Sequence, residues 1–128
     1  MITANNQTIK DVYKFRSLIS PIYTRDIRFE SDLVDSMYDS LSDTGLIEAY
    51  SFDLAKNNIS ITLKETATEQ DVIGVVESIG DTIQEYVLRN QKYIQVNEAD
   101  QEEFNKFINY KSLLFEHFIL GKKICITL

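Results

Sequence analysis

The sequence predicts a single α+β domain, residues 1–128, in which a small antiparallel or mixed sheet packs against about four helices. Three observations predict this class. Apolar residues recur at helical spacing in several segments, they alternate with polar residues over 46–63, and the chain ends in a β-branched apolar run at 124–128. The sheet should therefore combine a central hairpin with a C-terminal strand. A chain of 128 residues is long enough to bury a core without disulfides or a metal.

The N-terminal segment predicts a helix followed by a short extended stretch. The first helix is expected over 9–19, with Thr8 as its cap. Pro21 should end it, because the residue before a proline is biased away from helical geometry. Apolar and charged residues alternate just beyond, over 26–29, which predicts the extended stretch.

The next segment predicts a second helix and the hairpin. Ser31 is a good N-cap and Gly45 a good C-terminal stop for a helix with apolar residues at helical spacing. The hairpin should then run over 46–63. Its turn is expected at 56–58, where two asparagines tolerate left-handed backbone conformations.

A third helix should open with a capping box formed by Thr66 and Glu69 and continue to about Leu88. Gly80 lies inside it, and since glycine weakens a helix, its presence predicts close packing at that point. Residues 93–96 predict a short strand.

A fourth helix is predicted over 100–120, with Gly121 as its C-cap. It carries more apolar residues than one face can bury. One stripe would face the core: Phe104, Phe107, Ile108, Phe115, Phe118 and Ile119. A second stripe would lie around the back and is our candidate partner-binding surface: Tyr110, Leu113, His117 and Leu120. The strand at 124–128 would add an apolar edge that invites pairing unless it is covered.

The charge is concentrated in the middle of the chain. The net charge is −7, yet residues 1–28 and 89–128 are each net positive. Two helical stripes carry the excess and form a second candidate partner-binding surface: Asp32, Asp35, Asp39 and Asp43, then Glu77, Asp81 and Glu85. Such stripes suit either a solvated face or a docking surface for a basic partner. A globally acidic chain also argues against direct nucleic-acid binding.

Catalytic chemistry is poorly supported. His117 is the only histidine, and Cys125, its one conceivable nucleophilic partner, lies in an apolar strand. The tripeptide Asp43-Thr44-Gly45 resembles that of aspartic proteases, and the segment 71–74 resembles their later apolar-apolar-Gly motif. However, Asp43 ends a helical pattern, and the intervening segment is too short for a flap hairpin. The sequence therefore favours a helix stop here, and it predicts no catalytic residue, metal site or cofactor.

Our first hypothesis is a non-catalytic protein–protein interaction protein, a small subunit of a larger assembly such as a viral or phage particle. The alternatives are an acidic inhibitor that imitates nucleic acid and a small dimeric aspartic hydrolase centred on Asp43. We expect a protein partner or self-association, and no direct nucleic acid, membrane or small-molecule substrate. The N-terminus lacks the features of a signal peptide, so a cytoplasmic or virion-associated location is expected.

Overall fold

The computed structural model describes residues 2–24, 27–94 and 96–128. Within these ranges the helices are α1 (Ile2–Thr24), α2 (Ile27–Ser42), α3 (Glu69–Arg89) and α4 (Glu98–Phe107). The strands are β1 (Ile47–Asp53), β2 (Asn58–Leu63), β3 (Glu116–Leu120) and β4 (Lys123–Thr127). They form one antiparallel sheet in the order β1-β2-β4-β3. The predicted α+β class with a small sheet is confirmed.

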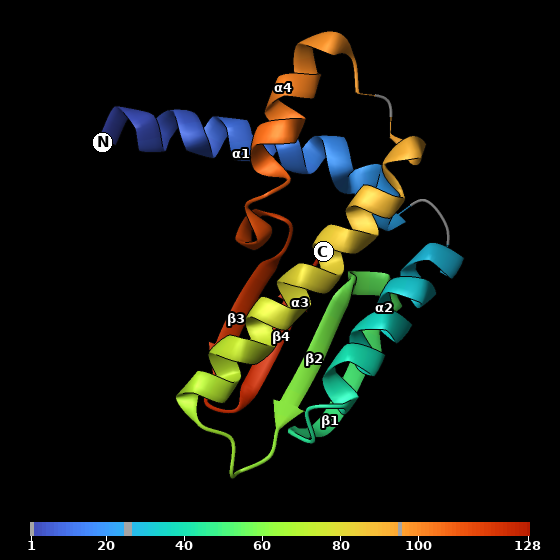
Figure 1. Ribbon diagram of the computed structural model, residues 1–128, viewed down its shortest axis with the longest axis vertical. Coiled ribbons are helices and arrows are strands. Elements are labelled where there is room, and N and C mark those ends of the chain that lie inside the picture. The colour runs from blue at the N-terminus through green and yellow to red at the C-terminus, as the bar shows by residue number, and fades with distance from the viewer. Residues whose placement is uncertain (1, 25–26, 95) are drawn as a thin grey trace.

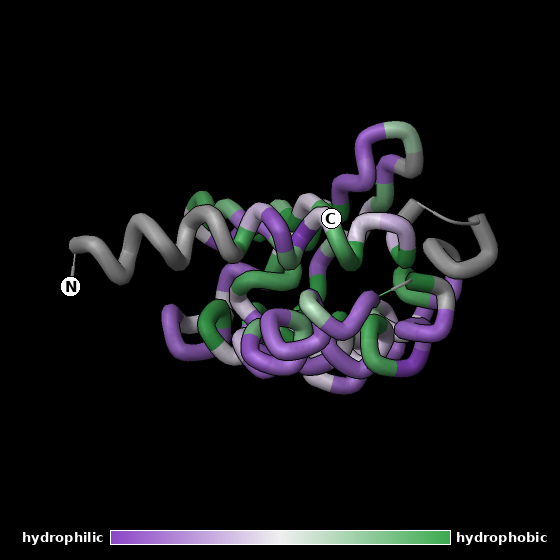
Figure 2. The backbone as a smooth tube through the Cα atoms, turned by 90° about the horizontal axis from the view of Figure 1, so that it is seen from above, coloured by the Kyte–Doolittle hydropathy of each residue, from purple (hydrophilic) through white to green (hydrophobic). Residues whose placement is uncertain are grey.

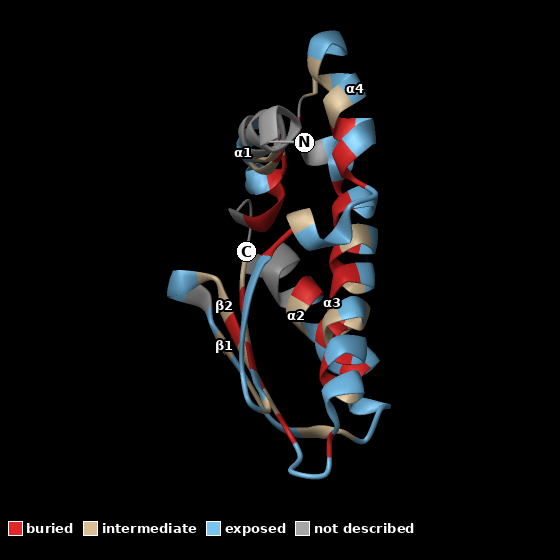
Figure 3. Ribbon diagram, turned by 90° about the vertical axis from the view of Figure 1, so that its left-hand side faces the viewer, coloured by how far each residue is buried: buried red, intermediate tan, exposed pale blue. Residues whose placement is uncertain are grey.

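The molecule has two layers, with α2 and α3 against one face of the sheet (Figure 1). Seen edge-on, none of the helices in the described residues lies along the other face of the sheet (Figure 3). Hydrophobic and hydrophilic positions alternate along the coils of the helices (Figure 2), as expected for helices with one buried side. The helices α1 and α4 pack against each other at one end of the layers.

The core lies between the helices and the inner face of the sheet. Ile59 pairs with Ile126 and Ile61 with Ile124, and all four are fully buried. They meet a row of buried side chains from the helices: Leu33, Met37, Leu41, Val75, Ile79 and Ile83. The pairing of β2 with β4 thus places the most buried part of the sheet under α2 and α3.

Two hairpins supply the strands. The first confirms the predicted hairpin, but η1 (Leu54–Lys56) and Asn57 connect its strands, so the turn predicted at 56–58 begins two residues earlier and Asn58 belongs to β2. Asn57 has a φ of 51°, the left-handed conformation for which asparagine is suited. In the second, only Gly121 and Lys122 separate β3 from β4, and Gly121 has a φ of 61°. A glycine with positive φ at the first of two turn residues is typical of a type II′ hairpin turn.

The first two helices are longer than predicted. α1 begins at Ile2 and continues past Pro21 to Thr24, so Thr8 is not its cap and Pro21 does not end it. The last turn buries Ile22 and Tyr23. That burial offsets the backbone bond that the proline removes.

The extended stretch predicted at 26–29 is also wrong where the structure describes it, because α2 begins at Ile27 and contains Ser31. Alternation over so few residues is a weak strand signal. The predicted C-terminal stop is confirmed: the Gly45 amide donates to the Ser42 carbonyl, and Gly45 has a φ of 70°.

The helix α3 begins two residues later than predicted. Its capping box is formed by Thr68 and Asp71: the Asp71 amide donates to Thr68 Oγ1, and the Thr68 amide donates to Asp71 Oδ2. Thr66 instead lies in a turn closed by a hydrogen bond from the Ala67 amide to the Lys64 carbonyl. Both threonines are followed three residues later by an acid, so the motif alone does not choose between them.

The largest correction concerns the fourth helix. α4 ends at Phe107, and the rest of the predicted helix becomes η3 (Lys111–Leu113) and β3. Gly121 is a hairpin turn residue, not a helix cap. Positive φ is needed at both kinds of site, so the glycine signal is ambiguous. The predicted strand at 93–96 does not form in the described residues. Tyr93 is the last residue of η2 (Gln91–Tyr93), residues 94 and 96 are not in a strand, and residue 95 lies outside the described residues.

Close packing at Gly80 is confirmed and gives a test of the fold. A Cβ added at Gly80 would lie 3.1 Å from the Lys111 Cβ, whereas one at Gly74 would meet nothing within 4 Å. Gly74→Ala should therefore raise the free energy of unfolding by about 0.5–1 kcal/mol, since it removes only the cost of glycine in a helix. Gly80→Ala should raise the free energy of unfolding by less, because the added methyl group would displace the Lys111 side chain. Urea unfolding measures both, and an equal gain at the two sites would contradict the packing of α3 on η3.

Tyr23 connects α1 to the chain before β3. Its hydroxyl donates to the Leu114 carbonyl over 2.9 Å, and burial raises its pKa well above the ordinary value of 10. Tyr23→Phe should lower the free energy of unfolding by about 1 kcal/mol. Because the pKa of Tyr23 is higher in the folded than in the unfolded protein, its neutral form adds to the free energy of unfolding. This contribution is complete below the unfolded pKa and is lost as the pH rises through the folded pKa. The variant should therefore lose less stability above pH 10 than the wild type, in urea titrations across that range. Tyr13→Phe, at an exposed tyrosine, is the control and should change neither quantity.

Candidate protein interaction surface

The strand β3 forms one edge of the sheet, with β4 on its inner side. All five of its residues are exposed, including Phe118 at 62% and Leu120 at 67%. Large apolar side chains on an unpaired strand edge are uncommon in monomers, because such an edge can pair with another chain. This edge is therefore the first candidate surface.

The backbone groups at the free edge can be identified from the register. The Leu63 amide donates to the Lys122 carbonyl, and the Leu128 amide donates to the Asn57 carbonyl. In an antiparallel strand successive residues direct their backbone groups to opposite sides. The even-numbered residues of β4 therefore bond to β2, and its odd-numbered residues bond to β3. Lys123, Cys125 and Thr127 pair with the even-numbered residues of β3, which leaves the N–H and C=O groups of His117 and Ile119 at the free edge.

The side chains of β3 divide between the two faces of the sheet. His117 pairs with Ile126 and Ile119 with Ile124, so both lie on the inner face with the core isoleucines. Phe118 pairs with Cys125 and Leu120 with Lys123, on the face that no helix covers. Elsewhere this face carries small or polar residues: Ala49, Ser51, Asn58, Ser60, Thr62 and Thr127. Phe118 and Leu120 thus form an apolar patch along one border of the bare face.

The opposite edge of the sheet is different. β1 contains an irregularity between Ile47 and Ala49, with the exposed carboxylate of Glu48 at that point. Bulges and charges are the usual devices that prevent edge strands from pairing. β3 has a continuous register from Glu116 to Leu120 and no proline or lysine within it. Of the two edges, only β3 has an unbroken register, and three of its five residues have large apolar side chains, with its one carboxylate, Glu116, at its first residue.

The predicted apolar stripe does not exist as one surface. Tyr110 is exposed in the loop after α4, while Leu113 lies in η3 and packs against the core. His117 and Leu120 lie on opposite faces of β3. The predicted C-terminal strand at 124–128 forms as β4, and because β2 and β3 cover it on both sides it is not a free edge.

Sequence reasoning missed Phe118 and Ile119, which it assigned to a helical core stripe. Both are exposed. The Gly-Lys pair between two apolar runs fits a two-residue hairpin, but the same glycine also fits a helix C-cap, so this signal alone does not identify the strand. Phe104, Phe107, Ile108 and Phe115 of the same predicted stripe are buried as expected.

The acidic residues of the second helix lie where the pattern puts them. Asp32, Asp35 and Asp39 are exposed on α2, and Asp43 is exposed in the turn that follows. The first three line a shallow cleft between α2 and α3 that also contains Arg89. This cation lowers the negative potential at the centre of the stripe. The pKa of the half-buried Tyr50 is raised well above its ordinary value, mainly by burial and further by the negative charge of Asp35.

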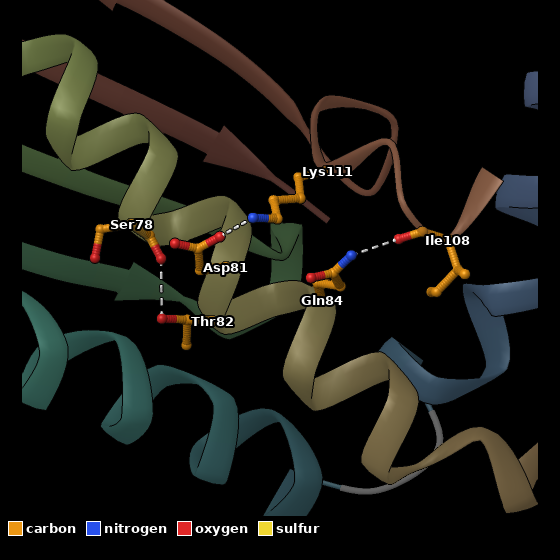
Figure 4. Close-up of polar contacts among 6 residues, drawn as sticks. All are labelled: Ser78, Asp81, Thr82, Gln84, Ile108 and Lys111. Atoms are coloured by element: carbon orange, nitrogen blue, oxygen red, sulfur yellow. Dashed lines mark hydrogen bonds and ion pairs between the residues drawn. The ribbon is translucent and has the colours of Figure 1, made fainter.

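The acidic stripe of α3 faces away from the sheet and is partly neutralised. Glu77, Asp81 and Glu85 are all exposed. Asp81 points toward Lys111 of η3 and forms an ion pair with it (Figure 4). Near this contact, Gln84 Nε2 donates to the Ile108 carbonyl over 3.0 Å (Figure 4). These contacts tie α3 to the segment that precedes β3.

The Asp81–Lys111 ion pair borders a cleft of about 350 Å³, lined by residues that include Glu77, Asp81, Lys111, Phe115 and His117. The His117 ring lies 5.7 Å from that of Phe115. His117 and Cys125 lie on opposite faces of the sheet, so they do not form a dyad. Among the described residues, no group of three or more His, Cys, Asp or Glu side chains is arranged to hold a metal ion.

The protease-like tripeptide forms the end of α2. Thr44 Oγ1 donates to the Leu41 carbonyl over 2.6 Å, and Gly45 supplies the left-handed residue that closes the helix. Asp43 is exposed in this turn. These residues thus have a local structural role.

Fold and surface together define a class: a two-layer α+β protein with helices on one face of its sheet and, in the described residues, a bare face bordered by a largely apolar strand whose outer edge is unpaired. Comparisons with family models, with curated proteins and with solved structures find no match to this chain. None of the helices in the described ranges has the length and apolar character of a membrane span. Function must therefore be inferred from the surface of this chain itself.

Proposed function

We propose that this chain is a non-catalytic protein–protein interaction protein, a small subunit of a larger assembly, and that it docks through β3 and the adjoining bare face of the sheet. The observation that carries the proposal is the exposure of all five residues of β3, with Phe118 and Leu120 on a face that no helix covers. Apolar patches with a polar surround are typical of protein interfaces. An assembly such as a viral or phage particle would supply the covering surface.

The contrast between the two sheet edges supports this location. Stability alone would favour the same protection at β3 as at β1, where a bulge and Glu48 interrupt the edge. An edge kept regular and apolar is suited to accept another strand, as in recognition by β-augmentation.

The double variant Phe118→Ser, Leu120→Ser tests the proposal. Because both side chains are mostly exposed, the free energy of unfolding should change by less than about 1 kcal/mol. Binding to the native partner should fall by at least about tenfold, since buried aromatic anchors dominate interface energy. The measurement is quantitative capture from the native host by the immobilised chain, followed by mass spectrometry and titration of the captured partner.

The matched control is Ile73→Ser, Leu88→Ser, which removes two exposed apolar side chains from α3 instead. It should leave capture unchanged. Equal loss with both double variants would point to non-specific adhesion, and unchanged capture by the β3 variant would remove this surface from the proposal.

The acidic inhibitor is a second candidate, favoured by one observation: Asp32, Asp35 and Asp39 are exposed on α2, and Asp43 is exposed in the turn that follows it. A basic channel meant for nucleic acid would accept such a row of carboxylates. Arg89 lines the same cleft as three of these carboxylates, and its positive charge weakens their negative potential. The inhibitor is therefore our second choice of function.

Asp35→Lys, Asp39→Lys tests the inhibitor. Partner binding should be lost without loss of the folded far-UV signal, and binding by the wild type should weaken as salt rises, because exposed charges are screened within about 10 Å at 0.1 M. Binding that is indifferent to both the charge reversal and the salt concentration would exclude this candidate.

A further inference from the structure

We propose that the occupant of the β3 edge is a second copy of this chain, paired antiparallel so that Phe118 lies opposite Phe118 of the second copy. This inference rests on the proposed function, because it names the partner of the same surface. It would join the two sheets into one sheet of eight strands, with a two-fold axis midway between the two Phe118 residues.

The backbone selects this register. The free edge presents the N–H and C=O groups of His117 and Ile119, with Phe118 between them. When two such edges meet antiparallel about Phe118, His117 of each copy lies opposite Ile119 of the other. Each of these pairs exchanges two hydrogen bonds, so all the outward groups of both residues are satisfied. Phe118 then forms the central non-hydrogen-bonded pair, in which opposing side chains lie closest.

Charge complementarity favours the antiparallel arrangement. β3 begins with the exposed Glu116 and is followed by Lys122 and the exposed Lys123. The Lys122 ammonium already donates to the Ala67 carbonyl, so Lys123 is the available cation. In the proposed register Glu116 of one copy lies opposite Leu120 of the other, whose neighbour in the sheet is Lys123. The backbones of Glu116 and of Lys123 in the other copy are two strand spacings apart, about 10 Å, which is within the combined reach of the two side chains. Parallel pairing would place Glu116 beside Glu116.

The side chains also match themselves on both faces. On the bare face, Phe118 would cover its counterpart, flanked by Leu120 from each copy. On the inner face, the exposed Ile119 of one copy would lie beside His117 of the other. Each apolar residue of the strand thus meets a neighbour from the second copy.

The first experiment is sedimentation velocity of the full chain from micromolar to millimolar concentration, comparing Ile119→Pro with Ile119→Val. Proline at 119 removes an N–H that points to the free edge and leaves the bonds to β4 intact, and edge strands tolerate proline there. The wild type and Ile119→Val should dimerise, and Ile119→Pro should dimerise at least about tenfold more weakly because two intermolecular bonds are lost. A wild type that stays monomeric at millimolar concentration, or equal dimerisation by the two variants, overturns the proposal.

A second measurement does not depend on how well the proline variant folds. In a Cys125→Ser background, which removes the free thiol beside Phe118, Phe118→Cys should form a disulfide-linked dimer on mild oxidation. Non-hydrogen-bonded strand pairs have Cα atoms about 4.5 Å apart, within the disulfide range. The control is Leu88→Cys in the same background, at an exposed position on α3. Equal crosslinking of the two overturns the register.

Failure here is distinguishable from failure of the proposed function. A monomeric wild type that still captures a host partner through Phe118 and Leu120 would mean that a different protein occupies the edge, so self-pairing is wrong while the interaction role stands. A chain that neither dimerises nor captures a partner through these residues would overturn both.

Discussion

The pairing of β2 with β4 is the interaction on which the rest of the structure depends. It joins two local hairpins, which lie far apart in the sequence, into one sheet. It also assembles the four isoleucines of the inner face, Ile59, Ile61, Ile124 and Ile126, into a continuous apolar platform for α2 and α3. A two-stranded hairpin alone is marginal in water, so neither half of the sheet would be stable without this contact. The β-branched side chains of the platform suit such a half-buried pleated surface.

The same pairing determines which strands are left at the edges. With β2 and β4 in the centre, β1 and β3 must be the outer strands. β1 carries the protection expected of an edge, whereas β3 does not. The acidic side chains, in contrast, gather on the outer surface of the helices, where Arg89 and Lys111 partly offset them. The apolar edge and the acidic surface therefore belong to different layers, and they impose different requirements on a partner.

Local patterns predicted much of the fold. The α+β class, the central hairpin, the Gly45 stop and the close packing at Gly80 all follow from short-range rules that the structure obeys. The segment 108–120 could not be predicted in this way, because its apolar residues fit a helical stripe as well as a strand, and only pairing with β4 decides between them. The candidate apolar surface depended on that segment, so only half of its predicted residues lie in β3: His117 and Leu120 do, whereas Tyr110 and Leu113 do not. The acidic residues lie on α2 and α3, whose helical spacing the sequence indicates although their first residues differ from the prediction, and Asp43 alone lies outside them, in the turn after α2.

Residue-resolved amide hydrogen exchange at two protein concentrations tests the central claim, that a second copy of the chain pairs at the free edge of β3, most directly. At low concentration the amides of Phe118 and Leu120, which bond to β4, should be protected, while those of His117 and Ile119 should exchange rapidly. At high concentration His117 and Ile119 should become protected as the second copy accepts their hydrogen bonds. Rapid exchange of these two amides at every concentration, or protection already present in the dilute monomer, would contradict the account.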